Sequence, residues 1–366
     1  MEAITSENVM LIGSLILMVG VLIGKTSYRT GLPLLLIFLL VGMGFGIDGL
    51  GVQFSDIHTA QSIGMIALCI ILFSGGLETK VAAIRPVLAP GLVLSTLGVL
   101  LTALLTGLFV WWLSGMSWTN IHFALLPSLL LAATMSSTDS ASVFGILGTQ
   151  NVHLKQQLRP MLELESGSND PMAYMLTILL IETIQLGGSL SAAELLWQLL
   201  LQFGIGIAGG YVCAKITQWA IIRYRRFGQK AATSEDGEQA SSMISILTLG
   251  AVFMTFSTVT LLGGNGYLAV YLLGILIGHY KVPCYRGVTK FMGGMSWLGQ
   301  IVVFLMLGLL VNPREMMTTA AVSVLVGVFI ILIGRPLSVM VCLLPFRKVT
   351  MMALLFVSWV GLRGAV

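Results

Sequence analysis

The amino-acid sequence predicts an all-α, polytopic membrane protein. Of its 366 residues, 57% are hydrophobic and only 9% are Asp, Glu, Lys or Arg. A soluble domain carries roughly a quarter charged residues, because its surface must face water. The apolar residues also form blocks long enough to cross a hydrocarbon core, which requires about 20 residues of helix. Composition and block length together favour a membrane protein over a large soluble one.

Twelve apolar spans follow one another along the chain, separated by turn signals rich in Gly, Pro and Asn. Their approximate bounds are 9–24, 31–47, 60–77, 87–113, 122–148, 161–186, 193–222, 242–262, 265–280, 293–311, 317–344 and 349–366. The N-terminus is acidic where a secretory signal is basic, so we expect the first span to be a retained helix. The one hydrophilic stretch, residues 223–242, is expected to be a cytoplasmic linker between two halves of the chain.

The basic residues predict the orientation. Loops after odd-numbered spans hold nearly all of the 19 Lys and Arg residues, among which we count Arg335. Only Arg314 lies in a loop after an even-numbered span, whereas Lys215 and Arg363 fall inside spans. By the positive-inside rule, the odd-numbered loops are cytoplasmic and the N-terminus faces outward. A net charge of +4 is too small to suggest nucleic-acid binding.

Polar residues interrupt the fifth span. Seven of the nine residues in 134–142 are polar, and Asp139 lies among them. Ser, Thr and Asp side chains compete for backbone hydrogen bonds, and non-helical backbone inside a membrane must be packed in protein or line a watery cavity. The pattern therefore predicts a broken helix whose free carbonyls can coordinate a cation, as in secondary transporters.

The sixth span carries a second polar segment. Ser166 and Asp170 lie four residues apart and share one helix face, while Glu165 and Asn169 share an adjacent face. Pro171 removes a backbone donor and frees a carbonyl one turn back. Hydroxyl, carboxylate and carbonyl oxygens suit an alkali cation but suit zinc or copper poorly. The scattered Cys and His residues likewise predict no metal centre and no other cofactor.

Buried carboxylates have two possible roles. Asp139 and Asp170 could pair with basic residues between helices, but neither of their spans contains Lys or Arg. Because intramembrane carboxylates are costly and usually functional, we expect an alkali-cation site at Asp139, Ser166 and Asp170. Arg363 lies inside the last span and must pair, and Glu165 is the buried acid that we expect to meet it as a structural clamp.

These segments resemble the monovalent cation:proton antiporter-1 family, most closely its NhaP branch of sodium or potassium/proton antiporters. The matching segments follow in family order and are residues 137–144, 165–171, 266–271, 304–311 and 358–366. The resemblance implies a thirteen-helix protomer with inverted repeats, a dimerisation domain, a mobile six-helix core and two crossed, interrupted helices. These helices match the fifth and last spans. About 12 of the 13 helices would be present, with the closing helix and any cytoplasmic regulatory domain lying beyond residue 366.

The resemblance also implies the roles of individual residues. The cation ligands would be the Thr138 carbonyl, Asp139, Ser166 and Asp170, supported by Asn169. Glu165 and Arg363 would form the structural ion pair. The expected protein is a homodimer in the bacterial inner membrane that exchanges potassium or sodium for protons.

The Asn169–Asp170 pair resembles the electroneutral type, which exchanges one cation for one proton. Asp170 would bind either a proton or a partly dehydrated cation. Ser74 stands where the family often has an acidic residue, so an accessory acid is missing there. Four glycines are expected to allow close helix packing: Gly75, Gly76, Gly274 and Gly278.

Two other classes remain as alternatives. An intramembrane aspartyl protease would use Asp139 and Asp170, but the Gly-x-Gly-Asp pattern is absent because Asp170 follows Gly-Ser-Asn. A cation channel would require a polar lining across several spans, whereas polarity here is confined to one depth of two spans.

Overall fold

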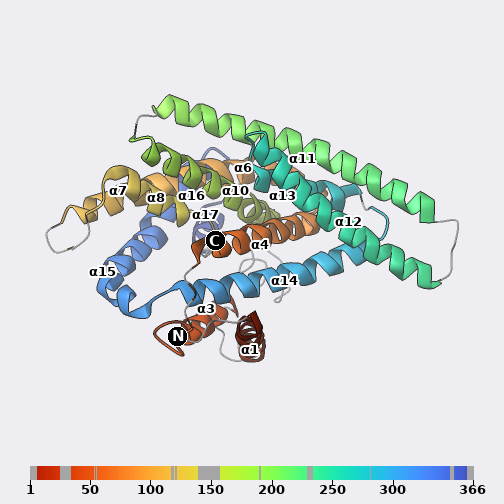
Figure 1. Cartoon of the computed structure of the whole chain (residues 1–366). Helices are drawn as coiled ribbons and strands as arrows, with labels where there is room; N and C mark the ends of the chain where they lie inside the picture. The colour runs from red at the N-terminus through yellow and green to blue at the C-terminus, as the bar shows by residue number, and fades with distance from the viewer. Residues whose placement is uncertain are drawn as a thin grey trace. The chain divides into compact units, whose positions relative to one another are not determined.

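The computed structural model describes residues 6–24, 34–52, 54, 56–116, 119, 122–138, 157–188, 191–228, 234–280, 282–346 and 350–360 (Figure 1). Helices occupy most of these residues, which confirms the predicted all-α class. In chain order they are α1 (Ser6–Gly24), α3 (Leu34–Phe45), α4 (Ile57–Glu78), α5 (Val81–Ile84), η1 (Arg85–Val87), α6 (Leu88–Val93), η2 (Leu94–Gly98), α7 (Val99–Ser114), α8 (Leu125–Thr134), α10 (Leu158–Gln185), α11 (Ala192–Gly228), α12 (Ser234–Leu261), α13 (Gly266–Tyr280), α14 (Tyr285–Leu310), α15 (Pro313–Phe329), η4 (Ile330–Gly334), α16 (Arg335–Leu343) and α17 (Met351–Val360).

Many helices are apolar enough to lie in a bilayer. Within the described ranges, six helical stretches have the length and composition to cross a membrane: Ile57–Glu78, Val81–Ser114, Ala193–Arg226, Gln239–Leu261, Tyr285–Leu310 and Thr319–Leu343. In Ala193–Arg226 only 22% of the most apolar window is buried inside the protein. A soluble protein rarely leaves so much apolar helix surface exposed. The exposed apolar surface therefore agrees with a polytopic membrane protein.

The chain forms two compact units. One consists of residues 1–71 and 293–321, and the other of residues 72–292 and 322–366. In the first unit α1 packs against α3, and an Asp48–Arg314 ion pair of 3.4 Å joins the turn after α3 to the first turn of α15. The candidate site lies wholly in the second unit.

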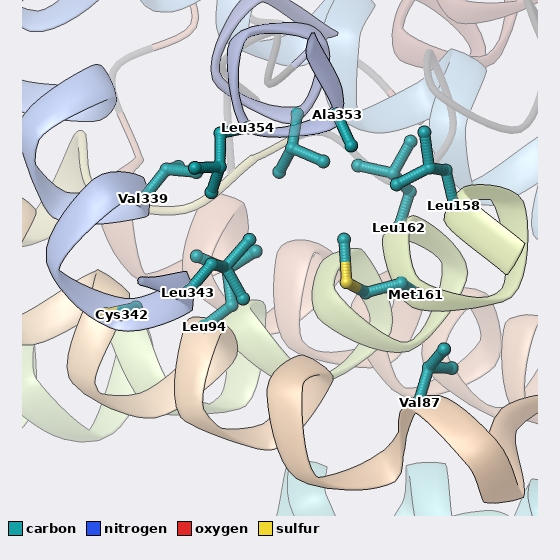
Figure 2. Close-up of a cluster of buried hydrophobic side chains, with 11 residues drawn as sticks. Val87, Leu94, Leu158, Met161, Leu162, Val339, Cys342, Leu343, Ala353 and Leu354 are labelled. Carbon is teal, nitrogen blue, oxygen red and sulfur yellow. The ribbon is translucent and has the colours of Figure 1, made fainter. Parts of the chain in front are cut away.

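The second unit is built around α10, which contacts α8, α6, η2, α13 and α17. Figure 2 shows the apolar cluster that holds the first turns of α10, with side chains from α10, η2, α16 and α17 pointing toward one another. Its buried members are Val87, Leu94, Leu158, Met161, Leu162, Val339, Cys342, Leu343, Ala353, Leu354 and Val357. Burial of so many aliphatic side chains fixes the helix immediately before its polar segment.

Two π-helical segments, η2 and η4, repeat one local pattern. Each segment ends in a glycine, Gly98 or Gly334. The hydroxyl of the residue four positions later donates a hydrogen bond of 2.7 Å to the carbonyl of that glycine. The two side chains are Thr102 and Ser338, and their hydroxyl oxygens lie 3.0 Å apart. The two π-helical segments are therefore tied together through the first turns of the helices that follow them.

Three of the four predicted packing glycines make close approaches. A Cβ atom on Gly76 would lie 2.5 Å from the Tyr271 carbonyl oxygen, and Gly274 and Gly278 face backbone atoms of α4 in the same way. Gly75 has open space beside it, so the prediction of close packing at this position is wrong. It points away from α13, because consecutive residues of a helix face different directions.

The predicted linker at residues 223–242 is helical at both ends. Helix α11 continues to Gly228, and α12 begins at Ser234. Hydropathy ends the seventh span too early and begins the eighth span too late, because charged residues can extend a helix beyond its apolar part.

Candidate functional site

The break in the fifth span lies where the polar segment begins. Helix α8 ends at Thr134, and the backbone from Met135 to Thr138 is not helical. The Ser136 hydroxyl donates to the Ala133 carbonyl at 2.7 Å, and the Ser136 N–H donates to the same carbonyl at 3.1 Å, so the residues after the break close the last turn of α8. The broken helix is thus confirmed as far as residue 138. Residues 139–156, including the predicted ligand Asp139, lie outside the described part of the chain.

Two consecutive residues after the break bind two consecutive residues of α10. The Ser137 hydroxyl donates to the Asp170 carboxylate, and the Asn169 amide donates to the Thr138 hydroxyl. All four residues are buried, with Asp170 only 6% exposed. The structure therefore brings together three predicted site residues, Thr138, Asn169 and Asp170. Ser137 is an additional member that the sequence analysis did not single out.

Ser166 lies one turn before Asp170 on α10 and is equally buried. The Asn169 amide oxygen is also buried and has no hydrogen-bond partner among the described residues. Hydroxyl, amide and carboxylate oxygens thus gather around one turn of α10. Such oxygens are the ligands that alkali and other hard cations prefer. The desolvation cost of a buried carboxylate favours uptake of a cation or a proton.

Glu165 pairs with Arg335, a residue that the sequence analysis did not connect with it. The Arg335 guanidinium donates to one Glu165 carboxylate oxygen, and both side chains are almost completely buried. The other Glu165 oxygen and the Arg335 Nε have no hydrogen-bond partner within the described ranges. Arg363, the predicted partner, lies outside the described residues. The interpretation of Arg335 as a loop residue is wrong, because it begins α16.

Asn265 binds the turn of α10 that follows Asp170. Its side-chain amide donates to the Pro171 carbonyl at 2.8 Å, and its side-chain oxygen accepts from the Leu268 N–H at 3.0 Å. The second bond caps the first turn of α13. One buried side chain therefore joins the start of α13 to α10 directly after Asp170. The turn signal around Asn265 predicted a loop but not this bridge.

A buried, oxygen-rich site at a helix break inside an apolar bundle is the architecture of secondary transporters. The family model described as "Sodium/hydrogen exchanger, transmembrane" matches residues 14–366. The chain belongs to this family.

Named relatives agree with this assignment. The chain is 37% identical over 372 residues to the K(+)/H(+) antiporter NhaP2 of Shewanella oneidensis, and 38% identical over 368 residues to the K(+)/H(+) antiporter NhaP of Alkalimonas amylolytica. Each alignment covers the whole of this chain but 60% of the relative, so the chain spans about three fifths of the length of these proteins. A solved structure of the sodium proton antiporter MjNhaP1 from Methanocaldococcus jannaschii matches with a TM-score of 0.77 at 23% identity. That match covers 96% of this chain and 82% of that one, and it shows the shared fold.

Proposed function

We propose that the protein exchanges a monovalent cation for protons through Asp170. The observation that carries this proposal is the geometry of one turn of α10, where a buried carboxylate lies beside the Ser137 hydroxyl and the Asn169 amide. The two relatives at 37–38% identity are named as K(+)/H(+) antiporters. Their names favour potassium as the cation, with sodium as the second candidate.

Exchange follows from competition for one carboxylate. Asp170 binds a proton or a cation, and either one neutralises the charge of the Asp170 carboxylate. An empty site would be a buried negative charge, which is costly to move through an apolar barrier. Only loaded forms then cross, so outward movement of one ion is coupled to inward movement of the other.

Asn169 supports one-for-one exchange. Its amide is neutral and is engaged with Thr138, so it adds no second proton-binding group beside Asp170. A site with one titrating carboxylate carries one cation or one proton per crossing. Asp139 is the second carboxylate that we expect nearby. We propose that it acts as a cation ligand and not as a carrier of a second proton.

The proposed setting is a homodimer in the bacterial inner membrane with its N-terminus outside. The distribution of basic residues supports this orientation, and the wide apolar surface of α11 supports a lipid environment.

Proteoliposomes that contain a pH-sensitive dye and an imposed proton gradient test the proposal. Addition of potassium, sodium or lithium in turn should collapse the gradient for at least one of these cations. Asp170→Asn should reduce exchange to background, because an amide cannot take up a proton at neutral pH. Asp48→Asn makes the same chemical change at the surface pair with Arg314 and serves as the matched control. No response to any cation, or full exchange by Asp170→Asn, would contradict the proposal.

A further inference from the structure

Tyr271 of α13 is inserted between α10 and the end of α4. Its side chain is only 3% exposed. Its ring lies directly against Gly167 of α10, where a Cβ atom would be 2.5 Å from the hydroxyl oxygen and 2.6 Å from two ring carbons. Its backbone carbonyl lies equally close to Gly76 of α4. A residue larger than glycine at position 167 or 76 would clash with Tyr271, so the two glycines allow the tyrosine to pack between the helices.

The Tyr271 hydroxyl is buried without a hydrogen-bond partner among the residues that the structure describes. The hydroxyls of Thr79 and Ser168 are its polar neighbours. In this conformation Thr79 instead donates to the Gly75 carbonyl at 2.8 Å. A buried phenol without a partner lowers the stability of the fold, so its presence calls for a functional explanation. A small rotation, or a water molecule, would connect it to either neighbour.

Carboxylates flank the hydroxyl on both sides along α10. Glu163 and Asp170 lie on either side of Gly167, four and three residues away, so all three share one helix stripe. Both acids interact electrostatically with Tyr271. The phenol therefore stands between the buried site and a second acid nearer the end of the helix.

That second acid reaches the surface. Glu163 is 18% exposed and pairs at 2.9 Å with Arg159, which is 48% exposed. The carboxylate of Glu78, at the end of α4, is close enough to Glu163 to repel it. Protonatable groups thus run from the solvent-exposed start of α10 inward to Asp170, with Tyr271 at the midpoint.

We propose that the Tyr271 hydroxyl relays protons between Glu163 and Asp170, an inference that rests on the proposed exchange activity. In each inward transfer, the phenol oxygen accepts a proton from the Glu163 side and its own O–H proton passes to the Asp170 carboxylate. The Thr79 and Ser168 hydroxyls bridge the remaining gaps. Tyrosine is neutral before and after the transfer, and rotation about its C–O bond restores the starting arrangement.

The proposed relay conducts protons but not cations. A chain of hydroxyls passes protons by exchange of hydrogen bonds, whereas a cation needs space along its whole path. The close packing of the ring on Gly167 leaves no such space. Proton entry and cation entry to Asp170 are therefore separable by mutation.

Two transport modes of the reconstituted protein distinguish the relay from a structural role. Cation/proton exchange is measured by the pH dye, and cation/cation exchange by uptake of a radioactive cation against the unlabelled one. Tyr271→Phe should slow cation/proton exchange about tenfold, with an unchanged half-saturating cation concentration, and leave cation/cation exchange within twofold of wild type.

Tyr267→Phe is the matched control. Tyr267 lies one turn earlier on α13, is equally buried and packs against the rings of Tyr174 and Phe256. This substitution should not separate the two modes. Glu163→Gln should reproduce the selective loss, and it replaces Tyr271→Phe as the deciding variant if the latter does not fold.

Each remaining outcome has a distinct meaning. A wild-type protein without exchange contradicts the proposed function itself. If the wild type exchanges and Tyr271→Phe matches it, the relay is wrong although the function stands. Equal slowing of both modes by Tyr271→Phe shows a packing role and also overturns the relay.

Discussion

Loss of Arg335 alone should destabilise the protein much more than loss of Arg335 and Glu165 together. The two charges are in contact, and at an effective dielectric constant of about 20 such a pair gains roughly 4 kcal/mol. Arg335→Met would leave Glu165, which is 1% exposed, as an uncompensated buried charge. Breaking a buried pair in this way costs about 3–5 kcal/mol. The midpoint of thermal unfolding should fall by roughly 5–15 °C.

The double variant Arg335→Met with Glu165→Met should recover most of this loss. Each partner has an atom without a hydrogen bond in the described part of the protein, so the attraction does not fully offset the desolvation of both charges. Thermal unfolding in detergent, followed by the fraction that stays monodisperse, measures the difference. Arg159→Met is the matched control, because its pair with Glu163 is partly exposed and contributes less than about 1 kcal/mol. A double variant as unstable as Arg335→Met would refute this reasoning.

Three further predictions concern helices α13 and α4. Asn265→Ala should lower the unfolding free energy by about 1–3 kcal/mol, because it removes the α13 cap and leaves the Pro171 carbonyl without its side-chain donor. Thermal unfolding in detergent measures this loss, and an unchanged midpoint would contradict the prediction. Gly76→Ala should lower stability by about 1–3 kcal/mol through overpacking against α13, whereas Gly75→Ala, which meets no atom within 4 Å, should be neutral or slightly stabilising; equal midpoints for the two variants would be the opposing result. Asp56 caps α4, and hydrogen bonds from Thr59 lower its pKa below the usual value of 3.8. The stability that this carboxylate contributes is therefore present above pH 3.8 and is lost as the pH falls through the lowered pKa. Unfolding free energies of wild type and Asp56→Ala, measured against pH, should converge at low pH, and parallel curves would argue against the cap.

Much of the fold and part of the site could be predicted from local patterns. Polar residues in an otherwise apolar span are unusual enough to locate both the break after Thr134 and the polar turn of α10. Helical spacing alone places Ser166 and Asp170 on one face. Which hydroxyl meets Asp170 depends on the path of the broken backbone. Spacing on a helix therefore cannot select Ser137 from its neighbours.

Arg335 shows a different limit. A count of charges assigns an arginine near the end of a span to the cytoplasmic side. It does not tell whether the guanidinium reaches water or a buried acid. Its position inside the predicted span 317–344 was the signal that an intramembrane partner was required. Which buried acid that partner is depends on helix packing across the second unit.

The paired π-helical segments have a consequence for comparing relatives. Relative to an α-helix, a π-helical turn contains one additional residue, so it rotates everything after it by about 100°. A homologue that lacks this residue in η2 would present a different face of α7, and its counterpart of Thr102 would no longer meet Ser338. A single-residue gap at either segment should therefore be matched by a compensating gap or substitution at the other. The two segments are therefore best aligned together, because a change in one is expected to require a change in the other, although more than two hundred residues separate them in the chain.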